Sequence, residues 1–251
     1  MNRNPRDQVY ENIGVGYASA RRPDPRIHQL IVASLGDAQS VVNLGAGAGN
    51  YEPTDRRVIA VEPSFAMIAQ RRAGAGPAAR AVAEALPFRD QTFDAALATF
   101  TLHHWTDLAA GLSELRRVAK RQVILLFEPS ESWQFWLVEY FPECLALPSE
   151  ISAPGVDDVR AHLAVHTVTT VPVPADCTDG FAGAYWRRPE AYLNPSVRAG
   201  ISSLALLSPT DAERGVQRLR EDLASGAWDA RYGYLRELPE IDLGYRLLIA
   251  G

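Results

Sequence analysis

The feature that most constrains the fold is a glycine-rich turn between two short apolar runs. Residues 41–44 read Val-Val-Asn-Leu, the next five read Gly-Ala-Gly-Ala-Gly, and a second apolar run at 58–61 ends in Glu62. Short apolar runs bounded by turns are typical of buried parallel strands. Glycines let the backbone turn at the carboxyl edge of a sheet and pass close to a ligand. A carboxylate at the tip of the next strand can accept hydrogen bonds from both hydroxyls of a ribose, so the pattern predicts a nucleotide-type site.

The spacing of the glycines separates two classes of nucleotide cofactor. A dinucleotide fingerprint reads G-x-G-x-x-G and directs a helix N-terminus at a pyrophosphate. This chain reads G-x-G-x-G at positions 45, 47 and 49, with no glycine at 48 or 50. An NAD(P)-dependent oxidoreductase therefore remains an alternative that the glycine spacing disfavours.

Four further motifs follow the glycine-rich turn in order. They are Ala-Glu-Ala-Leu-Pro-Phe at 83–88, Phe-Asp at 93–94, His-His at 103–104 and Leu-Arg-Arg-Val at 115–118. With the turn and its acidic strand end, these motifs resemble the class I S-adenosylmethionine-dependent methyltransferases. The resemblance is to the small-molecule branch that includes the ubiquinone/menaquinone methyltransferases, and it covers about residues 40 to 130.

The resemblance implies an α/β fold with a doubly wound, seven-stranded, mainly parallel sheet whose final strand is antiparallel. It also implies S-adenosyl-L-methionine as the cofactor, with the glycine-rich loop holding the methionine part and the acidic residue holding the ribose. An N-terminal segment is expected to cover this cofactor. The cofactor-binding residues expected on this basis are Asn43, Gly45, Ala46, Gly47, Gly49, Glu62, Pro63, Met67, Ala83, Glu84, Thr99 and, in the cover, Tyr17 and Arg21.

Three positions depart from the pattern of that family. Asn43 stands where the family usually has Asp, which keeps a hydrogen-bonding side chain and removes a charge. Val82 stands where the family commonly has an Asp for the adenine amino group, so we expect backbone groups or Glu84 to contact the adenine. Pro53 forbids a normal helix interior after the glycines, so a loop or one short turn is predicted over residues 50–56.

Candidate catalytic residues lie after the fourth and fifth predicted strands. We expect His104 to act as a base or to orient the acceptor, and Glu128 is a second candidate. The alternative is that His103 and His104 only pack or contact the cofactor. The walls of the acceptor pocket are expected from His104 together with aromatic side chains that follow the strands, namely Trp105, Trp133, Tyr185 and Trp186.

The order of apolar runs and turn residues along the chain predicts one domain, in which insertions are added to the central sheet. Within residues 1–251 we expect a helical N-terminal cap at 1–36, a cofactor-binding core at 37–130, and acceptor-side insertions at 130–160 and 179–240, the second forming a lid. Strands are predicted at 40–44, 57–61, 93–98, 122–127, 165–173 and 242–249, and helices at 27–35, 64–72 and 107–119.

Composition narrows the class of partner. The formal net charge is −5, and the longest clusters of basic residues are only pairs. We therefore expect no nucleic acid as a partner. No stretch of about 18 apolar residues occurs, and the two cysteines are far apart, so we expect no membrane span and a cytoplasmic, reduced chain. No set of side chains has metal-ligand spacing, so no metal is expected. The aromatic-rich insertions favour a partly aromatic or apolar small-molecule acceptor, and a non-catalytic S-adenosylmethionine-binding or partner protein is the other alternative.

Overall fold

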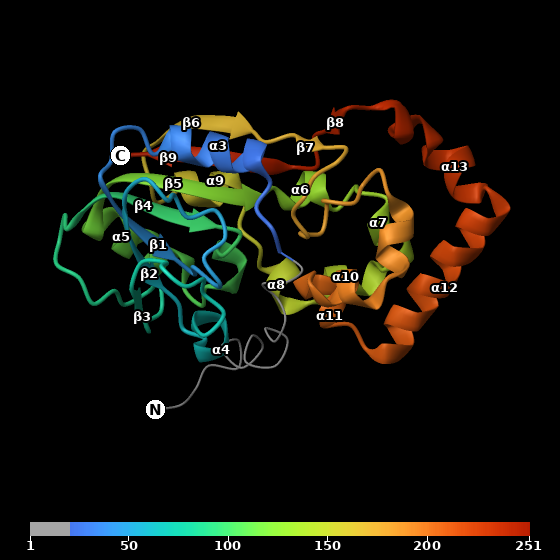
Figure 1. Ribbon diagram of the computed structural model, residues 1–251, viewed down its shortest axis with the longest axis horizontal. Helices are drawn as coiled ribbons and strands as arrows, with labels where there is room; N and C mark the ends of the chain where they lie inside the picture. The colour runs from blue at the N-terminus through green and yellow to red at the C-terminus, as the bar shows by residue number, and fades with distance from the viewer. Residues whose placement is uncertain (1–20) are drawn as a thin grey trace.

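A seven-stranded sheet is the centre of the computed structural model, which describes residues 21–251 (Figure 1). The strand order is β3-β2-β1-β4-β5-β9-β6. The pairs from β3 to β5 are parallel, whereas β9 runs antiparallel to both β5 and β6. The strands are β1 (Ser40–Leu44), β2 (Arg57–Val61), β3 (Ala78–Ala79), β4 (Phe93–Thr99), β5 (Ala119–Phe127), β6 (Val165–Thr170) and β9 (Tyr245–Ala250). The doubly wound sheet and its antiparallel last strand confirm the predicted fold class.

The order of the strands reverses between β1 and β4. The chain moves outward from β1 to β2 and β3, and then returns to place β4 on the other side of β1. Open α/β sheets form a crevice outside the carboxyl ends of their strands at such a point. The loops that follow Leu44 and Thr99 therefore lie together at this edge of the sheet.

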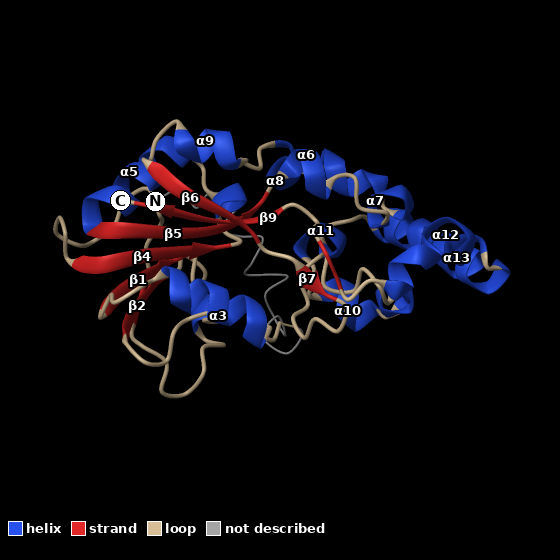
Figure 2. Cartoon of the chain, turned by 90° about the horizontal axis from the view of Figure 1, so that it is seen from above, coloured by secondary structure: helices blue, strands red, loops and turns tan. Residues whose placement is uncertain are grey.

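The central strands are buried on both faces because successive side chains alternate between two apolar clusters. Val41 and Val123 face the cluster that includes α3 (Pro25–Ser34), whereas Val42 and Ile124 face the opposite cluster. Helices α5 (Leu108–Val118) and α9 (Val156–Arg160) cover that opposite face, as Figure 2 shows. Continuous apolar runs in the sequence are therefore strands that are covered on both sides.

The longer helices begin and end at identifiable residues. The Asp107 side chain accepts a hydrogen bond from the Ala110 amide at 2.9 Å and caps α5. Ser208 caps α12 (Pro209–Ser225) in the same way, and Gly226 ends that helix in a left-handed conformation with φ of 78°. These caps set where α5 and α12 begin and where α12 ends, and each of the two helices buries one side against the rest of the protein.

A helical lobe extends from the carboxyl edge of the sheet, at the right of Figure 1. Its core is aromatic and continuous with the α3 side of the sheet, and it includes Trp136, Trp186 and Trp228. Besides α9, the elements beyond β5 that are not strands of the main sheet are α6 (Pro129–Ser132), α7 (Leu137–Tyr140), η2 (Pro142–Ala146), α8 (Pro148–Ile151), η3 (Pro189–Leu193), α10 (Pro195–Ala199), α11 (Ser202–Ala205), α12, α13 (Ala227–Tyr232), η4 (Gly233–Glu237) and a small sheet of β7 (Val173–Pro174) and β8 (Glu240–Ile241).

Two local expectations can be compared directly with the structure. The segment between β1 and β2 contains no helix, which confirms the effect expected of Pro53. The helix predicted at 64–72 was too long, because α4 covers only Phe65–Ile68. The chain leaves the helical path here, and Arg71 turns back to pair with Glu52 at 2.8 Å. No helix in the described part of the chain is long and apolar enough to cross a bilayer.

Candidate functional site

The glycine-rich loop after β1 needs residues without a Cβ at three places. Gly45, Gly47 and Gly49 have φ values of 58°, 53° and 91°, in the left-handed region that favours glycine. A Cβ on Gly45 would lie 1.8 Å from the Oγ1 atom of Thr101, whereas a Cβ on Gly47 would meet only the Met67 methyl at 3.1 Å. Gly45 therefore leaves room for the Thr101 side chain, whereas Gly47 leaves space open at the edge of a cavity. We call this space the Gly47 cradle.

The carboxylate of Glu62 joins the tip of β2 to this loop. One oxygen accepts a hydrogen bond from the Gly47 amide at 2.8 Å, and the other accepts from the Ser64 amide at 2.9 Å. The side chain is 7% exposed and lines the same cavity. A carboxylate has about four acceptor positions, so it can accept several hydrogen bonds at the same time.

A cavity opens above the loop at the strand-order reversal, and we call it the loop cavity. Ten of the predicted cofactor-binding residues line it: Arg21, Gly45, Ala46, Gly47, Glu62, Pro63, Met67, Ala83, Glu84 and Thr99. It is completed by residues that were not predicted as cofactor contacts, among them Ala48, Asn50, Tyr51, Ser64, Val82, Phe100, Thr101 and Thr106. Tyr17, and with it most of the predicted N-terminal cover, lies outside the described residues.

Asn43 and Gly49 do not line the loop cavity, and the structure gives them another role. The Asn43 side-chain amide donates to Glu52 at 3.0 Å, and Glu52 forms a buried two-bond ion pair with Arg71. A Cβ on Gly49 would lie 3.1 Å from both members of that pair. An aspartate at 43 would repel Glu52, and Gly49 leaves room for the pair, so both residues support this ion pair. Their contact with the cofactor stays a prediction.

Glu84 fixes the segment that carries the histidines. Its carboxylate accepts hydrogen bonds from the Thr106 amide at 2.6 Å, the Thr106 hydroxyl at 2.8 Å and the Asp107 amide at 3.2 Å. These bonds hold the start of α5 against the loop cavity, which Glu84 also lines. Its proposed contact with the adenine stays a prediction.

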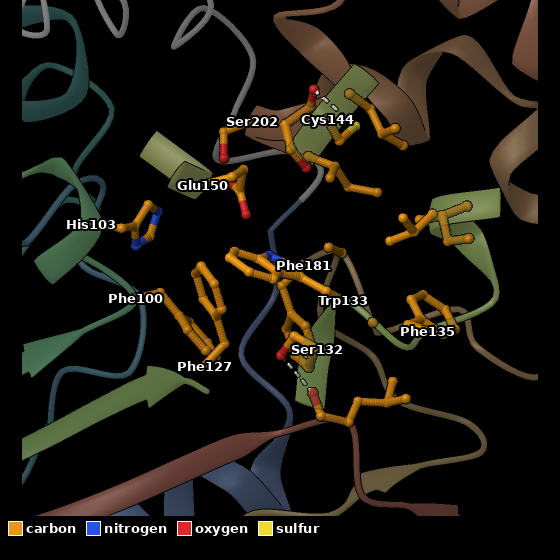
Figure 3. Close-up of a pocket in the computed structure, with 18 of the residues that line it drawn as sticks. Phe100, His103, Phe127, Ser132, Trp133, Phe135, Cys144, Glu150, Phe181 and Ser202 are labelled. Carbon is orange, nitrogen blue, oxygen red and sulfur yellow. Dashed lines mark hydrogen bonds between the residues drawn. The ribbon is translucent and has the colours of Figure 1, made fainter. Parts of the chain in front are cut away.

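A second cavity adjoins the loop cavity, and we call it the aromatic cavity (Figure 3). Arg21, Phe100 and His104 line both cavities. The remaining wall is mainly apolar and includes Phe127, Trp133, Phe135, Leu137, Val138, Phe141, Leu145, Phe181, Ile201, Leu204 and Leu243, with His103, Ser132, Cys144, Glu150, Ser202, Ser203 and Tyr245 as its polar members.

Phe100 stands at the boundary in an uncommon backbone conformation. Its φ is 52°, which a non-glycine residue adopts only when its surroundings enforce it. Its ring packs against Phe181 and Tyr245, with ring centres 5.3 and 5.5 Å away, and its amide donates to Leu125 at 2.8 Å. These contacts hold a strained residue where the two cavities meet.

Arg21 is held at the same boundary by a buried polar network. Its guanidinium forms two hydrogen bonds to Asp179, at 2.7 and 3.1 Å. The hydroxyl of Tyr51 donates to the same carboxylate at 2.7 Å, and burial raises the pKa of Tyr51 above its ordinary range. The network connects the segment after the glycine-rich loop with the second insertion through Arg21, which lines both cavities.

The predicted acceptor residues divide into two groups. His104 lines both cavities, Trp133 lines the aromatic cavity and Trp105 lines the loop cavity. Tyr185 and Trp186 line neither cavity. Trp186 is fully buried and donates from its ring nitrogen to the Val173 carbonyl at 3.0 Å, so it is part of the core of the lobe.

Glu128, the second catalytic candidate of the sequence analysis, makes hydrogen bonds within the protein. Its carboxylate accepts from the Val156 amide at 2.9 Å and from the Ser130 hydroxyl at 3.2 Å, and it lines neither cavity. A Cβ on Gly155 would lie 2.7 Å from an oxygen of the same carboxylate, so the glycine leaves room for it. The Glu128 side chain therefore ties the end of β5 to the start of α9, as a capping residue does.

Glu150 is a polar member of the aromatic cavity that the sequence analysis missed. It lies in a four-residue helix, α8, where no hydrophobic period could reveal which side faces inward. Burial raises the pKa of Glu150 to about 7. The signal available in the sequence was a lone carboxylate inside an aromatic-rich insertion, which is a weak one.

The loop cavity fits the cofactor that the sequence implied. The Gly47 cradle would be filled by any side chain, and the Glu62 carboxylate faces the same space. A cofactor in the loop cavity would reach the aromatic cavity where Phe100 and His104 line both.

Comparison with known proteins agrees with this architecture. The family described as Methyltransferase domain matches residues 42–127. A demethylmenaquinone methyltransferase of Thermobifida fusca is 40% identical over 106 residues, which cover 37% of this chain and 44% of that protein. The corresponding protein of Mycolicibacterium paratuberculosis is 30% identical over 162 residues, which cover 61% of this chain and 69% of that one. The match to the first relative thus spans less than half of its length.

A solved structure extends the similarity to nearly the whole chain. A protein of Anabaena variabilis, described as a methyltransferase from an antibiotic biosynthesis pathway, is 32% identical with a TM-score of 0.85. The match covers 92% of this chain and 99% of that one, so the helical lobe is included. The fold, the glycine-rich loop with its acidic strand end and these similarities lead to one conclusion. The chain belongs to the class I S-adenosylmethionine-dependent methyltransferases.

Proposed function

We propose that this protein transfers a methyl group from S-adenosylmethionine to an apolar small molecule held in the aromatic cavity. The observation that carries the proposal is that Arg21, Phe100 and His104 line both cavities. A cofactor on one side of this boundary and an acceptor on the other would meet without crossing solvent. The cofactor supplies a methyl group on a positively charged sulfur, which is already a reactive electrophile.

The residues of the chain then have mainly binding and orienting tasks. Gly47 and Glu62 hold the cofactor, and Met67 and Ala83 form apolar walls of its cavity. Alignment of two reactants can supply up to about 7–11 kcal/mol of the barrier to reaction, so a site of this kind needs little covalent chemistry. His104 stands at the boundary, where it can orient the nucleophilic atom of the acceptor.

The class of acceptor is supported by the lining of the aromatic cavity. Most of its side chains are aromatic or aliphatic, and they come largely from the two insertions at 130–160 and 179–240. We infer that these insertions form the acceptor wall and lid. The relatives named for demethylmenaquinone make that compound one candidate to test, together with other flat apolar molecules.

The test is turnover with isotopically labelled S-adenosylmethionine and a panel of apolar alcohols, phenols, amines and quinones, read by mass spectrometry. Transfer of the labelled methyl group to at least one panel member is expected. Cofactor binding without transfer to any member would favour a non-catalytic binding protein.

Replacement of His104 is expected to lower kcat with little change in cofactor affinity, because this side chain lines the boundary between the two cavities. His104→Ala should lose about tenfold or more, and His104→Gln should retain more if hydrogen bonding is the main role. His166→Ala is the matched control, since His166 is exposed on β6 and lines neither cavity. Unchanged kcat in both His104 variants would reject this role.

A further inference from the structure

Helix α8 reverses the usual sorting of polar and apolar side chains. Ile151 is 66% exposed, whereas its neighbour Glu150 is largely buried and lines the aromatic cavity. Figure 3 shows the Glu150 side chain in the cavity, with His103 and Phe181 on either side. An inward carboxylate is costly and an outward isoleucine gains nothing, so packing alone does not explain this arrangement.

The Glu150 carboxylate has no hydrogen-bonding or ion-pair partner within residues 21–251. The positive charge that lines the same cavity, Arg21, is engaged with Asp179 at 2.7 Å. Unlike Glu128 and Glu84, which bind backbone amides, Glu150 therefore has acceptor capacity directed into the cavity. A buried acceptor of this kind is satisfied when a ligand supplies the donor.

Two other titratable groups that line the aromatic cavity are Cys144 and Tyr245. Burial raises the pKa of Cys144 to about 12 and that of Tyr245 above its ordinary range, so both are uncharged near neutral pH. His103 and His104 belong to η1 (Leu102–His104), against which α8 packs. Burial itself is what raises the pKa of Glu150 to about 7, close to the pH at which a general base is most effective.

Helix α8 also brings this carboxylate toward the boundary between the two cavities. α8 contacts η1, and His104 of η1 lines both cavities. An acceptor that contacts Glu150 would therefore lie in the compartment that opens toward the cofactor. Its apolar body would fill the aromatic wall, and its single polar group would meet the carboxylate.

We propose that the acceptor is an apolar molecule with a hydroxyl group, and that Glu150 binds that hydroxyl and takes its proton during methyl transfer. This inference rests on the proposed function. The O–H bond breaks and its proton moves to the Glu150 carboxylate, while the acceptor oxygen forms a bond to the methyl carbon. The bond between that carbon and sulfur breaks, its electron pair stays on the sulfur, and Glu150 later releases the proton to water. The products are a methyl ether, S-adenosylhomocysteine and one proton, so charge and atoms balance.

The test measures, by fluorescence, the binding of three probes that share one naphthalene ring system, with S-adenosylhomocysteine saturating and again without it. The probes are naphthol, its methyl ether methoxynaphthalene, and naphthylmethylamine, all substituted at the same ring position. At pH 8 naphthol is expected to bind wild type about 10- to 100-fold more tightly than the ether, as a hydrogen bond to a charged acceptor does. Glu150→Gln should reduce this preference to a few-fold or less, because the amide is a weaker acceptor and no base.

Glu237→Gln is the matched control, because it makes the same chemical change at an exposed residue that lines neither cavity. It should keep the full preference. In wild type the preference should also shrink below about pH 6, as the carboxyl group becomes neutral. This pH dependence needs no variant and so does not depend on Glu150→Gln folding.

Three results would overturn the proposal. Naphthol and its ether could bind wild type equally, the preference could survive in Glu150→Gln, or naphthylmethylamine could bind most tightly and lose that advantage in Glu150→Gln. The last result would assign Glu150 to a cationic amine instead. Failure of S-adenosylhomocysteine to bind at all would contradict the proposed function, and the titrations without it would still test Glu150.

Discussion

At the scale of single residues, the three loop glycines carry different constraints. Gly45→Ala is expected to destabilise the protein by about 2–4 kcal/mol, because a Cβ there would overlap Thr101 as well as strain the backbone. Gly47→Ala should cost about 1–2 kcal/mol, since the Met67 methyl can move, but it should weaken cofactor binding.

Gly74→Ala separates the two effects, because Gly74 has φ of 84° and nothing within 4 Å of the added carbon. It measures the backbone cost alone. Urea unfolding of the three variants should rank them Gly45, Gly47, Gly74 from most to least destabilised. A Gly45→Ala variant as stable as Gly74→Ala would contradict the contact with Thr101.

Glu150 also makes a prediction about stability against pH. Its carboxyl pKa rises from 4.5 to about 7 on folding, so the folded state holds the proton more tightly than the unfolded state. That contribution is fully present below about pH 4.5 and is lost as the pH rises to about 7. Glu150→Gln removes the loss, so the variant should gain about 2 kcal/mol relative to wild type between pH 5 and pH 8.

Urea titrations at the two pH values measure this difference. The Glu237→Gln control should show no gain, because its side chain is exposed. A Glu150→Gln variant that follows the wild-type pH dependence would show that the carboxyl group is solvated in the folded protein.

The sequence predicted residues well where chemistry and backbone conformation coincide, and less well where packing decides. Glu62 and Gly47 could be predicted because a strand tip and a left-handed turn are local features. Trp186 could not be assigned to core or cavity, because that depends on which tertiary partner its ring meets. Glu150 could not be predicted because a four-residue helix has no sequence period.

At the scale of elements, an ion pair replaces the helix that Pro53 excludes between β1 and β2. Glu52 and Arg71 are 7% and 6% exposed in their side chains, and Asn43 donates to the same carboxylate. Arg71→Met should destabilise by about 3–5 kcal/mol, because it leaves a buried charge unpaired.

The double variant Glu52→Gln/Arg71→Met should recover part of that loss, since it leaves no buried charge. The coupling free energy from the double-mutant cycle measures the pair. Arg117→Met is a control at a more exposed ion pair, with 30% of the arginine side chain accessible, and should cost less. Additive losses at positions 52 and 71 would contradict the account of this loop.

Elements were predicted best where their residues repeat regularly. The predicted strands at 40–44 and 57–61 coincide with β1 and β2, because buried strands are short apolar runs bounded by turns. α5 was likewise predicted to within about one residue at each end. The short helices of the lobe were not predicted individually, since four or five residues show neither a period nor a full set of caps.

At the scale of the whole molecule, the lobe and the sheet share one apolar cluster. Trp136 lies within it, 4% exposed, with its ring nitrogen donating to the Trp186 carbonyl at 3.0 Å and its ring edge-on to Trp228 at 5.4 Å. Trp136→Ala should cost about 3–5 kcal/mol and should keep a single unfolding transition, because the cluster is continuous with the α3 side of the sheet.

Calorimetry together with circular dichroism checks whether one transition remains. Trp133→Ala is the control at a partly exposed tryptophan, 38% accessible, and should cost less. Two separate transitions in Trp136→Ala would show that the lobe folds independently of the sheet.

The central claim is that the loop cavity binds S-adenosylmethionine through Glu62. Isothermal titration of S-adenosylhomocysteine and NAD⁺ into wild type, Glu62→Ala and the surface control Glu213→Ala tests it most directly. We predict that wild type and the control bind S-adenosylhomocysteine more tightly than NAD⁺. Glu62→Ala should bind it about a hundredfold or more weakly, because two hydrogen bonds to a charged group are lost. Wild-type affinity in folded Glu62→Ala, or tighter binding of NAD⁺ than of S-adenosylhomocysteine, would contradict the claim.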